Sequence, residues 1–230
     1  MDNIQDPNVV SFGLIVQEMR NEITNLIKSI AEQATTKPMR ISNYVSLLIL
    51  FRIKECMVSV EILISKGLER DAATLILTLI ELRLDMQYIA LNYKKAEEWI
   101  NHNKENKKPW KVSFLLKELF PNENERESEK EIYRKFSMIK HGNPFGGTMS
   151  FSIGVENEWL VVNEKSNSNM RAIYIFAEGV ECHGIFKATL KDFSDAGFDI
   201  KSNEIAIESL NSKLLELNHK HVISMLSNTK

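Results

Sequence analysis

Residues 69–93, ERDAATLILTLIELRLDMQYIALNY, decide the fold that we expect for this chain. Hydrophobic residues lie on almost every side of this stretch when it is drawn as a helix, which is typical of a helix at the centre of a protein. Polar residues form one row at alternate steps of four and three residues. This polar stripe comprises Thr74, Thr78, Glu81, Asp85, Tyr88 and Asn92.

Two carboxylates on a buried helix are costly unless they have partners. We therefore expect a cation or a hydrogen-bond donor to face Glu81 and Asp85. For Glu81 we expect that donor on the later helix that carries Arg134. Two interpretations stay open. Either the partners are purely structural, such as the neighbours of Arg83 or a helix cap, or the stripe lines a polar cleft.

Similar helical periodicity continues on both sides of this stretch. Glycine and proline are scarce before residue 140, and Gly67 has the position of a helix C-cap. Between residues 142 and 166 the pattern alternates instead, which indicates either a small β-hairpin at about 148–163 or a loop. The expected helices are at about 8–34, 39–67, 69–93, 95–104, 110–119, 124–141, 167–194 and 202–227.

These elements predict an all-α fold, an antiparallel helical bundle that forms one domain over residues 1–230. Its helical core spans about 39–141, the hairpin or loop 142–166, and the C-terminal helices 167–227. With 43% hydrophobic and 26% charged residues, the chain has the composition of a globular protein and not of a disordered or fibrous one.

Charge and hydropathy exclude several classes of protein. A formal net charge of −2 does not provide the basic surface that long duplex nucleic acid requires. The N-terminal residues MDNIQDPNVVSFG lack the basic and apolar regions of a signal peptide. The apolar stretch 43–64 is interrupted by Arg52, Lys54 and Glu55, so we expect a core helix and no membrane segment. We expect a cytoplasmic protein whose two cysteines, Cys56 and Cys182, are buried thiols.

A second stretch, EIYRKFSMIKHGNPFGG at 131–147, contains the candidate catalytic residues. Arg134 and His141 are seven residues apart and therefore differ by only about 20° around a helix, with Ser137 between them. A guanidinium can bind a phosphate, and an imidazole can transfer a proton near neutral pH. This pair could cleave RNA without a metal ion or other cofactor. Alternatively, His141 only bonds to carbonyl groups at the helix end.

The arrangement of Arg134, six intervening residues and His141 near a helix end resembles the motif of the HEPN superfamily (higher eukaryotes and prokaryotes nucleotide-binding domains). The wider pattern resembles an uncharacterised bacterial helical family with "RSLxE"-like and "YRxLSxxxHG"-like segments, over roughly residues 40–145. The matching segments are Leu79-Ile80-Glu81 with Tyr88-Ile89-Ala90, and Tyr133-Arg134-Lys135-Phe136-Ser137 with His141-Gly142. The chain departs from these patterns at two places. Leu77-Thr78 stand where the "RSLxE"-like segment has its arginine, and Lys135 stands where HEPN ribonucleases usually have a small polar residue, often asparagine.

This resemblance implies a helical homodimer in which two motifs meet in one ribonuclease site, as in toxins and antiviral defence proteins. It implies catalytic roles for Arg134 and His141, with no metal. The candidate supporting residues are Ser137, Glu81, Lys140, Tyr133 and Asp85.

A local basic segment suggests where RNA could bind. Lys107 and Lys108 precede Trp110, and Lys104 and Lys111 complete this basic segment. A basic loop with an aromatic ring can contact single-stranded RNA, although such a segment can equally be a solvated linker. Two classes of function therefore remain open. One is a homodimeric, metal-independent ribonuclease. The other is a non-catalytic helical interaction or dimerisation protein that acts as an effector or partner subunit in a defence operon. The candidate partners are RNA and an antitoxin or another protein of such an operon.

Overall fold

The computed structural model describes the backbone of residues 7–105, 109–140, 151–153, 159–161 and 168–227, and the side chains of 9–102, 109–140 and 171–221. It confirms the all-α fold. The N-terminal elements are α1 (Pro7–Gln33), α2 (Ile41–Ser65), α3 (Glu69–Leu91), the 3-10 turn η1 (Tyr93–Lys95) and α4 (Ala96–Glu105). They are followed by α5 (Val112–Leu119), α6 (Glu123–Lys140), β1 (Phe151–Ile153), β2 (Trp159–Val161), α8 (Ser168–Asp195) and α9 (Lys201–Ser227).

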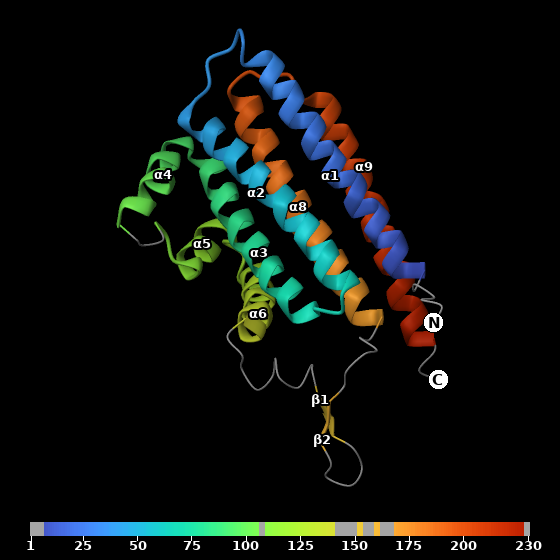
Figure 1. Cartoon of the computed structure of the whole chain (residues 1–230). Helices are drawn as coiled ribbons and strands as arrows, with labels where there is room; N and C mark the ends of the chain where they lie inside the picture. The colour runs from blue at the N-terminus through green and yellow to red at the C-terminus, as the bar shows by residue number, and fades with distance from the viewer. Residues whose placement is uncertain (1–6, 106–108, 141–150, 154–158, 162–167, 228–230) are drawn as a thin grey trace.

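Five long helices form the bundle, and the shorter helices cover one side of it. In Figure 1, α1 and α9 run side by side at the right, α2 crosses in front of α8, and α3 lies to their left. Helix α3 packs against α2 and α8 on one side and against α5 and α6 on the other. Leu79 is fully buried, and Leu75 and Leu82 pack against the core. The predicted central position of residues 69–93 is therefore confirmed.

Two glycines allow the chain to reverse between long helices. Gly67 follows α2 with a φ of 74°, and Gly197 follows α8 with a φ of 82°. After α2, the amide of Leu68 donates to the carbonyl of Leu63 and that of Gly67 to Ile64, which is the Schellman arrangement. Left-handed φ values strain residues with a Cβ, so glycine is suited to both positions.

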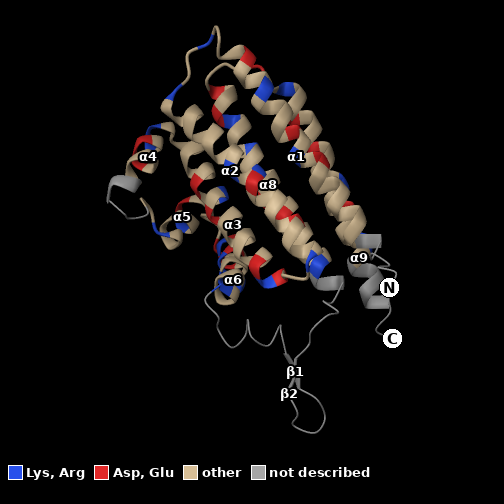
Figure 2. Ribbon diagram, in the orientation of Figure 1, with Lys and Arg blue, Asp and Glu red and all other residues tan. Residues whose placement is uncertain are grey.

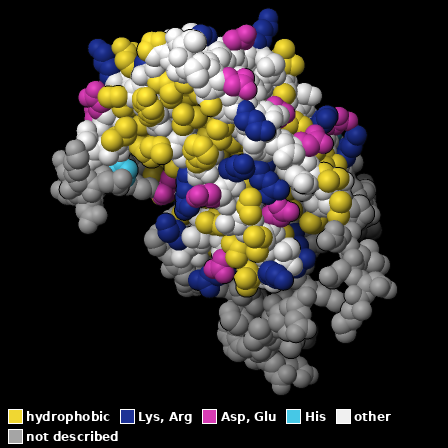
Figure 3. Space-filling model, turned by 45° about the horizontal axis from the view of Figure 1, so that its top comes forward, with side chains coloured by type: hydrophobic (Ala, Val, Ile, Leu, Met, Phe, Trp, Pro, Cys, Tyr) yellow, Lys and Arg dark blue, Asp and Glu magenta, His cyan; other side chains and the backbone are white. Residues whose placement is uncertain are grey.

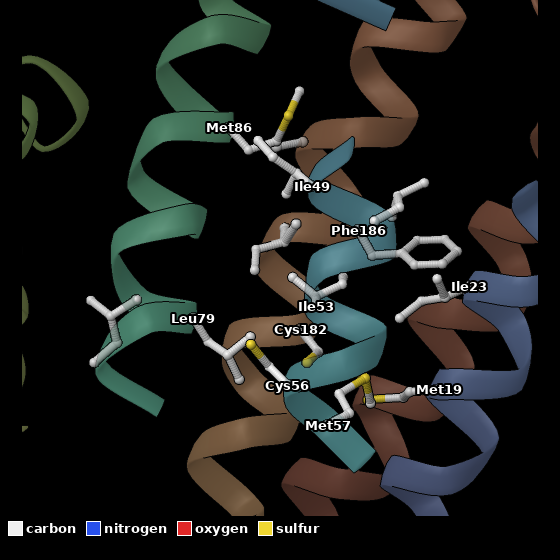
Figure 4. Packing of buried hydrophobic residues seen from close by; sticks show 14 of the residues in the cluster. Met19, Ile23, Ile49, Ile53, Cys56, Met57, Leu79, Met86, Cys182 and Phe186 are labelled. Carbon is white, nitrogen blue, oxygen red and sulfur yellow. The ribbon is translucent and has the colours of Figure 1, made fainter. Parts of the chain in front are cut away.

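The core forms where four of the long helices meet. Figure 4 shows Met19 and Ile23 of α1, Ile53 of α2, Leu79 of α3 and Phe186 of α8 pointing into one apolar interior. The two cysteines lie in the same interior as free, buried thiols, as expected. Burial raises the pKa of both thiols, so they stay protonated near neutral pH.

The segment between α6 and α8 contains one short antiparallel strand pair. Phe151 pairs with Val161 and Ile153 with Trp159, which lies within the range predicted for a hairpin. Among the described residues, no helix combines the length and apolar character needed to cross a membrane.

Candidate functional site

The described part of the candidate catalytic motif, Arg134 to Lys140, lies on the last turns of α6. The Arg134 side chain is 58% exposed, and its Nε and Nη2 donate to the two carboxylate oxygens of Glu131 at 2.8 and 2.7 Å. The hydrogen bond raises the pKa of Arg134 and lowers the pKa of Glu131. Ser137 is half-buried and Lys140 is exposed. His141 lies outside the described residues, so its pairing with Arg134 stays a prediction.

The polar stripe of α3 does have the partners that we expected. The Tyr133 hydroxyl donates to Glu81 Oε1 at 3.2 Å, and Trp99 Nε1 donates to Asp85 Oδ2 at 3.0 Å. Tyr133 belongs to α6, so the expectation that Glu81 faces the helix of Arg134 is confirmed. Burial and the charge of Glu81 raise the pKa of Tyr133, which keeps its hydroxyl a donor.

The remaining contacts of this stripe indicate an interface between helices and not an open cleft. The Tyr88 ring packs edge-on against Trp110, with centroids 4.9 Å apart, and against Phe114, with centroids 5.6 Å apart. Helices α4, α5 and α6 thus supply the groups that face the stripe. Of the two interpretations left open, these contacts favour structural partners.

The position of Trp110 requires a correction to the predicted RNA contact. Its side chain is 8% exposed, packs on Tyr88, and donates from Nε1 to Glu98 Oε2 at 3.1 Å. A ring held in this way has no free face on which a base could stack. Lys107 and Lys108, its predicted companions, lie outside the described residues.

A buried ion-pair network, which we name the Arg83 network, was not identified from the sequence. Arg83 of α3 donates from Nε to Glu181 of α8 and from Nη2 to Glu129 of α6, both at 2.5 Å. Burial lowers the pKa of Arg83, but the two carboxylates outweigh this effect and raise it above its usual value. A Cβ added to Gly184 of α8 would lie 2.5 Å from Arg83 Cδ, so the absence of a side chain there makes room for the arginine. The network joins three helices.

The sequence contains one indication of this network, which is the charged residue Arg83 on a largely apolar face of its helix. Arg83 lies within residues 69–93 but outside the polar stripe, on a side of the helix that is hydrophobic apart from Gln87. Its partners are 46 and 98 residues away along the chain. Spacing along one helix could therefore indicate that a partner was needed but could not identify it.

Two further polar sites are buried between α2 and α8 or within α8: a hydrogen-bonded cluster around Asp192, and the carboxyl of Glu178. Asn43 and Ser46 each donate to Asp192 Oδ2 at 2.8 Å. Glu178 is 1% exposed, and its Oε1 has no hydrogen-bond partner among the described residues. Burial raises the pKa of Glu178 well above its usual value; Glu61 adds to the rise and Arg20 opposes it. Within the described residues, no three His, Cys, Asp or Glu side chains gather as metal ligands.

The most distinctive surface feature of the described residues is an apolar face on α2. The sequence predicted a core helix, but only one side of α2 lies in the core. The other side exposes hydrophobic residues to between 39% and 55%, at alternate steps of three and four positions around Glu55. These residues, which we name the α2 stripe, are Ile41, Tyr44, Leu48, Phe51, Val58 and Ile62.

Neighbouring residues extend the α2 stripe at its N-terminal end. Tyr93 of η1 is 49% exposed and packs under Arg40, 5.0 Å from its guanidinium, and Leu91 is 65% exposed. Figure 3 shows hydrophobic side chains gathered into one broad area at the upper left, on the side of α2 and α4. In Figure 2 charges of both signs are scattered along the described helices, whereas the first part of α2, residues 41–51, contains no charged residue.

Comparison of the chain with protein-family models, with curated proteins and with solved structures gave no match. The candidate sites are therefore judged on their own chemistry and geometry.

Proposed function

We propose that this chain is a non-catalytic helical interaction protein that binds a helix of a partner through the α2 stripe. The observation that carries the proposal is the exposed hydrophobic row on α2, repeated at helical spacing over more than five turns. An apolar row at such spacing is what one helix presents to another.

The size of the row supports a binding role. Six half-exposed hydrophobic side chains on one helix form a patch on the order of 600 Å², at the upper limit for a typical monomer surface. Removing that area from water would contribute on the order of 15 kcal/mol before the cost of association. Association costs about 4–15 kcal/mol, so binding by this face is energetically reasonable.

The second class of function, the metal-independent ribonuclease, stays a prediction. It rests on Arg134 and His141, and the Arg134 guanidinium donates to the carboxylate of Glu131 and to Met138 Sδ, both on its own helix. A phosphate would have to replace this carboxylate. By contrast, the α2 stripe needs no rearrangement to contact a partner, and for this reason we prefer the interaction role.

Site-specific photo-crosslinking in cells tests the proposal. A photoreactive phenylalanine would replace Leu48 or Phe51 of the α2 stripe, and in the control it would replace Ile205 of α9, which is 63% exposed. We expect a discrete protein adduct from both α2 positions and not from the α9 position. If the α2 positions give no adduct under conditions in which the protein is folded, or if all three positions give the same adducts, the proposal is wrong.

A further inference from the structure

We infer that the partner of the α2 stripe is a second copy of this chain, bound with the two α2 helices antiparallel about a twofold axis that passes the exposed face at the level of Ile53, between Phe51 and Glu55. This inference rests on the proposed function and specifies its partner. Three features support it: the heptad spacing of the exposed face, the position of its one charged pair, and the area that two copies would bury.

The spacing of the exposed residues is that of a coiled-coil seam. Positions 41, 44, 48, 51, 55, 58 and 62 follow one another at three and four residues, as the a and d positions of consecutive heptads do. From the first to the last, the row extends over about 32 Å of helix. The opposite side of α2, which includes Ile49, Ile53 and Val60, is fully buried in the core. Helix α2 is therefore apolar on two faces, of which the described residues of the chain cover one.

The single charged residue within the row selects the orientation. Glu55 is 70% exposed and pairs with Arg52, which is 53% exposed, at 3.2 Å. In a parallel, in-register pair the two Glu55 side chains would meet in one layer and repel each other. In an antiparallel pair centred on Ile53, Leu48 faces the partner's Val58, and Tyr44 faces the partner's Ile62. In the same register Glu55 faces the partner's Phe51, and the next residue of the partner is Arg52, so each carboxylate lies beside an arginine of the other copy.

The buried area is that of a small but stable interface. Two α2 stripes together would remove roughly 1,200 Å² from water, which is the lower limit for specific protein–protein interfaces. Leu91 and Tyr93 lie beyond the N-terminal end of each stripe and would add to this area. A twofold axis closes the assembly at two copies, because each apolar face is then covered by its equivalent.

Sedimentation equilibrium of the full chain tests the self-association. We expect a mass of twice 26.5 kDa that dissociates on dilution. Phe51→Glu should weaken the dimer about tenfold or more, whereas Ile205→Glu, an exposed hydrophobic residue on α9, should leave it unchanged. Circular dichroism would establish that both variants are folded. Glu55→Arg should also weaken the dimer, and adding Arg52→Glu should restore it.

Engineered cysteines test the orientation. The native cysteines are buried, so disulfides formed by new surface thiols can be detected without interference from them. A mixture of Leu48→Cys and Val58→Cys chains should form a disulfide-linked dimer, whereas Leu48→Cys chains alone should not. Efficient linking of Leu48→Cys alone would overturn the antiparallel arrangement.

A wild-type chain that stays monomeric at high concentration would overturn the self-association. If photo-crosslinking at Leu48 still yields an adduct with a different protein in that case, the proposed function stands and only its partner was misassigned. If neither a dimer nor an adduct forms, both are wrong.

Discussion

Replacing Arg83 with methionine should destabilise this protein far more than the same replacement at Arg134. Methionine keeps most of the apolar stem of arginine, so the change chiefly removes the charge and its hydrogen bonds. Arg83 and Glu181 are each 7% exposed, and Glu129 is 24% exposed. Removing one partner of a buried ion pair costs about 3–5 kcal/mol, because the remaining charge has no solvent and no counter-ion.

The protein can limit that cost by protonating Glu181. Burial already raises the pKa of Glu181 and Arg83 opposes the rise, so the pKa rises further when the arginine is lost. A carboxyl whose pKa is raised in the folded state stabilises the fold below its unfolded pKa, and this stability is lost as pH rises through the folded value. We therefore expect a loss near 3 kcal/mol at neutral pH, a smaller loss in mild acid and a larger loss in mild base.

Thermal unfolding followed by circular dichroism would measure this loss. For a chain of this length, about 3 kcal/mol corresponds to a fall in Tm of about 6–12 °C. Arg134→Met breaks an ion pair whose side chains are 58% and 45% exposed, and it should lower Tm by no more than about 2 °C. Arg83→Met combined with Glu181→Met should recover most of the stability. Equal, small effects of the two single variants would refute the structural role of the Arg83 network.

Three further predictions concern the core and the α6 motif. Gly184→Ala should lower the free energy of unfolding by about 1–3 kcal/mol, because the new methyl collides with buried Arg83. Gly13→Ala, on an open face of α1, should instead raise it by up to about 1 kcal/mol, and chemical denaturation would measure both changes. Glu178→Gln should raise Tm increasingly from about pH 5 to about pH 8, because the raised pKa of the native carboxyl makes wild-type stability fall as pH rises; parallel pH profiles would contradict this. Purified protein should leave single-stranded RNA intact in EDTA, and cleavage that Arg134→Ala and His141→Ala both abolish would favour the ribonuclease instead.

Local patterns in the sequence were sufficient to predict the positions of the helices and which helix lies at the centre of the bundle. Hydrophobic periodicity depends on the immediate neighbours of each residue, so the limits of α3 and the C-cap at Gly67 could be predicted without any tertiary contact. The row containing Glu81 and Asp85 likewise predicted that hydrogen-bond donors would face it, because a carboxylate removed from water needs a partner. The donors are Tyr133 for Glu81 and Trp99 for Asp85.

Tertiary structure decided which residues became those partners and which apolar faces remained uncovered. Tyr133 reaches Glu81 across 52 residues of chain, and Trp110 turns into the core although its basic neighbours suggested a surface loop. Helix α2 has hydrophobic residues on two faces, so its composition indicated burial but could not show that the described residues cover only one of these faces. Periodicity describes the faces of a single helix, whereas burial and ion pairing depend on helices that are distant in sequence and become neighbours only in the folded bundle.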